Sequence, residues 1–181
     1  GNKGAGVFLR KKQEGRILDA IAEYLEVRGP IAGTKTAAAQ AWLKALTGSK
    51  ELPEEWVRLD WDGYRLAWRT EARNDDKRTL IAAILPPHVA VTDKAPFVRP
   101  FKLQVSEKGL KWSLQYEYPQ LLYLAGMLSS FACDSVARTR LAKKDFKSHL
   151  FRALPVPPWR DSRPQRRIAE LYARLTCLPT T

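Results

Sequence analysis

Prolines constrain the fold of this chain more than any other feature of its sequence, because they set where helices and strands must end. Proline lacks a backbone N–H donor and is tolerated in a helix only in the first turn. Gly29-Pro30 therefore ends one helical stretch, and Pro86-Pro87 ends an apolar run. Pro119 suits the first turn of a helix. The prolines within 154–159 keep that segment extended, since a residue before proline avoids the helical region.

Apolar residues recur at helical spacing in the stretches between these prolines. The predicted helices cover 13–27, a stretch from Thr34 or Thr36 to Gly48, 119–132, and a last stretch that begins at Asp161 or Ser162. The opening residues 1–6 are rich in glycine and are predicted to be loose.

Alternation of polar and apolar residues predicts strands. Two alternating runs, 56–61 and 64–69, flank Asp62-Gly63 and predict a β-hairpin. The continuous apolar run 80–85 predicts a strand buried on both faces, and Gly109 predicts a turn. Further strands are predicted over 88–92 and within 97–105.

Together these elements predict an α+β fold. We expect a twisted, mostly antiparallel sheet of about five strands with flanking helices. A helical N-terminal extension and a C-terminal helix complete the prediction.

The chain begins with Gly1, and its only methionine is Met127. We therefore expect a piece of a longer protein, whose missing part precedes the predicted N-terminal helices. Cys133 and Cys177 are too few for a disulfide framework, and no apolar run is long enough to cross a membrane. We expect a cytoplasmic protein with reduced thiols and no membrane partner.

The formal net charge of +12 is spread unevenly. Residues 136–181 hold eleven basic and three acidic side chains, whereas residues 51–80 hold six and eight. A concentrated basic region attracts polyanions, and double-stranded DNA is the partner that we expect. A membrane surface is a weaker alternative, because prolines interrupt the basic region and prevent one long amphipathic helix.

Residue types that read DNA bases gather at the end of the predicted hairpin and in the loop after it. Arginine can bond both acceptors of guanine, asparagine pairs with adenine, and threonine contacts the thymine methyl group or a phosphate. The candidates for base reading are Arg69, Arg73, Asn74, Arg78 and Thr79. The candidates for phosphate contact are Lys94, Arg138, Arg140, Lys143, Lys144 and Lys147. A purely structural alternative is equally open, in which Arg69 and Arg73 pair with the neighbouring carboxylates of Glu71, Asp75 and Asp76.

Motifs of catalysis are missing from the sequence. It contains no P-loop, no glycine-rich S-adenosylmethionine-binding turn after a strand, and no NPPY-like element. His88 and His149 lack a metal-ligand partner at useful spacing. Asp75-Asp76 with Asp93-Lys94 leaves a small metal-dependent nuclease as an alternative. We expect no catalytic residue, metal or cofactor in this chain.

Three stretches of the sequence carry a resemblance to a known family. Residues 64–96, YRLAWRTEARNDDKRTLIAAILPPHVAVTDKAP, resemble a segment of large bacterial restriction-modification and phage-defence adenine methyltransferases. That segment has an arginine-containing strand, a polar loop, an Arg-Thr step and an apolar strand ending in Pro-Pro. Residues 119–159, PQLLYLAGMLSSFACDSVARTRLAKKDFKSHLFRALPVPPW, and the closing RIAELYARLT are similar to the C-terminal specificity domain of the same family.

The resemblance implies that residues 51–181 form the target recognition domain of a Type IIG-like adenine-specific DNA methyltransferase, and that residues 1–50 are a helical connector to the missing N-terminal part. It also implies that S-adenosylmethionine and methyl transfer, and in some members a nuclease, belong to the missing part. A protein-interaction domain whose basic face meets an acidic partner remains an alternative.

Overall fold

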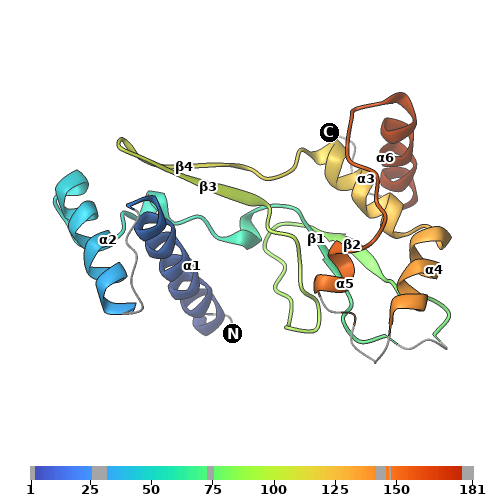
Figure 1. Ribbon diagram of the computed structural model, residues 1–181, viewed down its shortest axis with the longest axis horizontal. Helices are drawn as coiled ribbons and strands as arrows, with labels where there is room; N and C mark the ends of the chain where they lie inside the picture. Colours follow the sequence, from blue (N-terminus) through green and yellow to red (C-terminus); the bar gives the residue numbers. More distant parts are fainter. Residues whose placement is uncertain (1–2, 26–31, 73–75, 142–145, 147, 177–181) are drawn as a thin grey trace. The chain divides into compact units, whose positions relative to one another are not determined.

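The computed structural model describes residues 3–25, 32–72, 76–141, 146 and 148–176 (Figure 1). It confirms the predicted α+β class: helices lie at both ends of the chain, and the paired strands are antiparallel. The chain forms two compact units. Unit 1 comprises residues 1–62 and 101–114, and unit 2 comprises residues 63–100 and 115–181.

Unit 1 is built on two helices, α1 (Lys3–Tyr24) and α2 (Ala32–Thr47). Ile17 and Ile21 of α1 stand one turn apart and are fully buried against Ala39 and Leu43 of α2. Burial of each large aliphatic side chain stabilises the unit by roughly 1.5–3 kcal/mol. Gly48 ends α2 with a φ of 78°, a conformation that glycine adopts without a Cβ clash.

The hairpin β3 (Phe101–Ser106) and β4 (Gly109–Leu114) completes unit 1. Its apolar side chains at Leu103, Val105 and Trp112 pack against the helical core. Gly109, with a φ of 122°, opens β4 and confirms the predicted turn.

Unit 2 holds a second antiparallel pair, β1 (Arg65–Trp68) and β2 (Ala82–Leu85), in the register Arg65 to Leu85 and Trp68 to Ala82. All four residues of β1 are buried. The Trp68 indole stacks on Phe151 with ring centroids 3.9 Å apart. The core of the unit is therefore centred on β1.

Helices surround this pair: α3 (Tyr118–Leu128), α4 (Phe131–Arg140), α5 (Ser148–Arg152) and α6 (Arg163–Thr176). Helices α3 and α6 lie side by side (Figure 1). They approach closely at Gly126, where a Cβ atom would stand 2.8 Å from the Ile168 Cγ2. The close packing of α3 on α6 therefore requires a glycine at this position.

The predicted hairpin around Asp62-Gly63 is wrong. The segment before the turn packs into unit 1 instead, where the Trp56 carbonyl oxygen accepts a hydrogen bond from the Trp112 Nε1 at 3.0 Å. Short 3-10 turns over Glu54–Trp56 and Asp60–Asp62 replace the first predicted strand. Tertiary packing of a tryptophan overrides the local alternation here.

Other strand predictions also differ from the structure. The described strands form two separate two-stranded sheets instead of one sheet of about five. Because β2 belongs to a two-stranded sheet, it is half-exposed, and Ile81 just before it is 44% exposed. Residues 88–92 form no strand, since His88 adopts a φ of 63° after the two prolines.

The helices match their predictions more closely. The predicted loose start is wrong from Lys3 onward, where α1 already begins. The helix predicted over 119–132 is interrupted at Ser129 and Ser130, because the Ser130 side chain caps a new helix by accepting the Cys133 N–H. The predicted division at residue 50 stays a prediction. Among the described helices, none combines the length and apolar character that a membrane crossing needs.

Candidate nucleic-acid interface

Three of the predicted DNA-contacting residues come together in unit 2, and we name Arg69, Arg78 and Arg138 the arginine cluster. Arg69 directly follows β1, Arg78 lies shortly before β2, and Arg138 lies in the last turn of α4. Antiparallel pairing of the strands brings Arg69 and Arg78 side by side, so that the Nη2 of Arg69 donates to the Arg78 carbonyl oxygen at 3.2 Å. The Nη2 of Arg138 donates to the carbonyl oxygen of Lys77 at 3.4 Å.

Asp134 forms ion pairs with two members of the cluster. This aspartate is 5% exposed, and its Oδ1 accepts the backbone N–H of Leu80 at 2.7 Å. Its Oδ2 lies 3.3 Å from the Nη2 of Arg138, and its Oδ1 lies 3.8 Å from the Nε of Arg78. One buried carboxylate therefore pairs with guanidinium groups from two different elements, and it accepts a hydrogen bond from Arg138.

The third member pairs with a different carboxylate. The Nη2 of Arg69 lies 2.8 Å from the Oδ2 of Asp76, so the ion pairing that the sequence left open is present for this arginine. Among the described residues, the three guanidinium groups of the cluster thus pair with the carboxylates of Asp134 and Asp76. The side chains of Arg69, Arg78 and Arg138 remain 40%, 33% and 34% exposed. Each arginine has five N–H donors, and such exposure leaves room for an external acceptor.

The other predicted residues that the structure describes are buried or paired with neighbouring groups. Thr79 is fully buried and presents no surface to DNA. Lys94 pairs with Glu71, and this hydrogen bond lowers the pKa of the glutamate. Arg140 donates to the carbonyl oxygen of Ala153. The remaining candidates, Arg73, Asn74, Lys143, Lys144 and Lys147, lie outside the described residues.

Unit 2 carries most of the positive charge of the chain. Its sequence holds eighteen Lys and Arg against nine Asp and Glu, whereas unit 1 holds thirteen against ten. The unit that contains the arginine cluster therefore has a formal net charge of +9, and unit 1 has +3. Such a field attracts a polyanion toward unit 2.

Two residues of this region were not predicted as functional from the sequence. Asp134 shares the buried side of α4 with Ala137, and a carboxylate in an apolar helical stripe is the signal that points to it. Phe131 is an apolar position of the single helix predicted over 119–132. Because the helix is interrupted before it, Phe131 begins α4 and is 82% exposed, with the Arg78 guanidinium 5.5 Å from its ring centroid.

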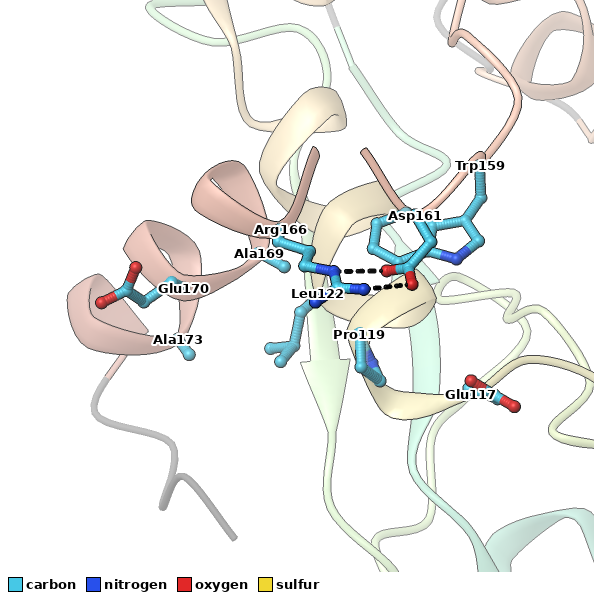
Figure 2. Close-up of a pocket in the computed structure, with 9 residues that line it drawn as sticks. All are labelled: Glu117, Pro119, Leu122, Trp159, Asp161, Arg166, Ala169, Glu170 and Ala173. Atoms are coloured by element: carbon cyan, nitrogen blue, oxygen red, sulfur yellow. Dashed lines mark hydrogen bonds and ion pairs between the residues drawn. The ribbon is translucent and has the colours of Figure 1, made fainter. Parts of the chain in front are cut away.

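A groove lies beside α3 and α6, away from the predicted residues (Figure 2). It has a volume of about 600 Å³, and Leu122, Trp159 and Ala169 supply apolar lining. Arg166 and Asp161 cross it as a two-point ion pair at 2.7 and 2.5 Å, which lowers the pKa of the aspartate. Glu170 at its margin pairs with Arg167 at 2.8 Å. The charged groups of Arg166, Asp161 and Glu170 are thus engaged with one another or with neighbouring arginines.

No three or more His, Cys, Asp or Glu side chains gather as a metal site within the described part of the chain. Comparison of the chain with protein-family models, curated proteins and solved structures found no match.

Proposed function

We propose that this chain is a sequence-specific binding module for duplex DNA, and that the arginine cluster of unit 2 is its reading surface. The observation that carries the proposal is that Arg78 and Arg138, from different elements, both pair with the single buried carboxylate of Asp134. The Arg78 guanidinium is oriented further by the hydrogen bond from its Nη2 to the Ser129 carbonyl oxygen at 2.7 Å. A preoriented guanidinium loses little conformational entropy when it binds a planar pair of acceptors. Guanine offers such a pair, O6 and N7, at the floor of the major groove.

Phosphate contacts would come from cations outside the cluster. Lys94 and Arg140 are exposed, and the outer face of α6 adds Arg163, Arg167 and Arg174. Such contacts position a protein on the duplex without reading sequence. The +9 charge of unit 2 supports this division between base reading and phosphate contact.

The resemblance of residues 64–96 and 119–159 supports a more specific proposal. In it, the chain is the target recognition domain of a bacterial, cytoplasmic restriction-modification or phage-defence adenine methyltransferase. The methyltransferase part would bind S-adenosylmethionine and extrude the target adenine from the duplex, while this chain would select the sequence.

A selection experiment tests DNA binding directly. The full chain is mixed with a pool of random duplexes at two salt concentrations, and the retained duplexes are sequenced. We expect a recovered motif. Arg78→Lys keeps the charge beside Asp134 but loses the guanidinium fork, so it should relax the motif at one base pair by about 1–3 kcal/mol. Arg167→Lys on the exposed face of α6 is the matched control and should leave the motif unchanged.

The other outcomes separate the alternatives. Retention without a motif and with a steep salt dependence would reduce the function to phosphate binding. Nicking of the duplexes in the presence of a divalent cation would point to the nuclease alternative. Absence of retention at low salt would contradict DNA binding and favour an acidic protein partner.

A further inference from the structure

Phe131 is one of the two most exposed large apolar side chains in the described part of the chain. Its side chain is 82% exposed, whereas Phe101 and Phe146 are nearly or fully buried. A phenyl ring left in water forgoes the stabilisation that burial gives Phe101 and Phe146. An exposed aromatic ring with an arginine beside it is a candidate stacking contact for a nucleobase.

The backbone that carries the ring is held in a fixed position at the start of α4. Ser130 precedes it as the N-cap, with its Oγ accepting the Cys133 N–H at 3.2 Å and donating to the Met127 carbonyl oxygen at 2.6 Å. Cys133 and Ala137 anchor the opposite side of the helix in the core. A ring on so constrained a backbone loses little entropy on binding.

A fixed cation lies beside this ring. The Arg78 guanidinium stands 5.5 Å from the ring centroid and is fixed by a 2.7 Å hydrogen bond to the carbonyl oxygen of Ser129. Arg138 shares the Asp134 carboxylate with Arg78. A flat apolar face beside a fixed guanidinium group matches a nucleic acid, in which each base offers a π-face beside an anionic backbone.

We propose that Phe131 stacks on a nucleobase that is unstacked from its neighbours in the bound DNA. This inference rests on the proposed DNA binding and adds a contact to it. Apolar side chains that insert at a base step pay the cost of unstacking that step. DNA in which a base is already unpaired should consequently bind more tightly, because that cost is largely absent.

Two duplexes of the same sequence test the proposal with the full chain, one fully paired and one carrying a single unpaired adenine. Wild-type protein should bind the second about tenfold more tightly, and Phe131→Ala should lose this preference. Phe131→Trp, which keeps an aromatic face, should retain the preference. Leu175→Ala is the matched control, because Leu175 is also 82% exposed but lies on α6.

Equal preference in wild type and Phe131→Ala, in protein that binds DNA, would overturn the stacking proposal and leave the proposed function standing. Loss of the preference in Leu175→Ala as well would also overturn it, since any exposed apolar side chain would then suffice. Failure of wild type to bind either duplex would overturn DNA binding and the stacking contact together.

Discussion

At the scale of single residues, the buried carboxylate of Asp134 is the position on which most of the candidate interface depends. It satisfies the N–H of Leu80 and stands between Arg78 and Arg138. Its removal would leave a buried donor without its acceptor and two arginines without their shared partner. The same side chain therefore serves both the fold and the surface.

Asp134→Ala should lower the free energy of unfolding by about 2–3 kcal/mol, because the Leu80 N–H and the arginines lose their partner. Asp134→Asn keeps an oxygen for Leu80 and should cost less. Urea unfolding measures both variants. Glu170→Ala, which removes an exposed carboxylate paired with Arg167, is the control and should leave stability nearly unchanged. Equal effects of Asp134→Ala and Glu170→Ala would contradict this role.

The exposed residue Lys94 gives a prediction for DNA affinity. If Lys94 contacts a phosphate, Lys94→Ala should reduce the slope of log affinity against log salt by about 1 and weaken all sequences alike. Fluorescence anisotropy at several salt concentrations measures that slope. Lys111→Ala, on β4 of unit 1, is the comparison, and an equal reduction there would remove Lys94 from the proposed contacts.

At the scale of elements, the close contact of α3 with α6 depends on a glycine, Gly126. A methyl group at Gly126 would meet the Ile168 Cγ2 at 2.8 Å and the Tyr172 Cβ at 3.3 Å. Both neighbours are anchored close to the α6 backbone and yield little. The two helices would have to separate to admit it.

Gly126→Ala should therefore destabilise the protein by about 1–3 kcal/mol through overpacking. Gly15→Ala is the matched control in α1, where an added Cβ meets nothing within 4 Å. It should stabilise the protein by about 0.5–1 kcal/mol, because alanine favours the helix. Thermal unfolding of the two variants should shift in opposite directions, and a shift in the same direction would refute this account.

Burial at the same helix contact raises the pKa of Tyr172 above its ordinary value of 10.0. A folded-state pKa above the unfolded value favours the neutral phenol. Its contribution to stability is full below about pH 10 and is lost as the pH rises through the higher folded pKa. As the pH rises through this range, the free energy of unfolding should fall less steeply for Tyr172→Phe than for wild type. Parallel curves of the free energy of unfolding against pH would exclude the effect.

Local signals predicted helices better than strands. The stripe of Ile17 and Ile21 predicted most of α1, because helical packing follows from neighbours along the chain. The partner of β1 was missed, because strand pairing depends on distant residues and the Trp56 run packs elsewhere. Arg69 and Arg78 were singled out by residue type. Their meeting with Arg138 could not be predicted, since it depends on a carboxylate from α4.

At the scale of the whole molecule, unit 2 carries most of the excess charge but is not continuous in sequence. Residues 101–114, which belong to unit 1, separate its two segments. The chain therefore passes between the units at three places. Folding of either unit requires residues that are far apart in the sequence, and such contacts are slow to form.

The inserted hairpin leaves and re-enters unit 2 at adjacent points, because the Gln115 N–H donates to the Pro100 carbonyl oxygen at 2.7 Å. A simple truncation that starts at Gly63 would retain β3 and β4 without α1 and α2, with Leu103, Val105 and Trp112 bare and prone to aggregate. Excising residues 101–114 and closing the gap with a short turn would avoid this exposure. We therefore expect that unit 2 can be produced by itself, with its two segments, 63–100 and 115–181, joined by a short turn between Pro100 and Gln115.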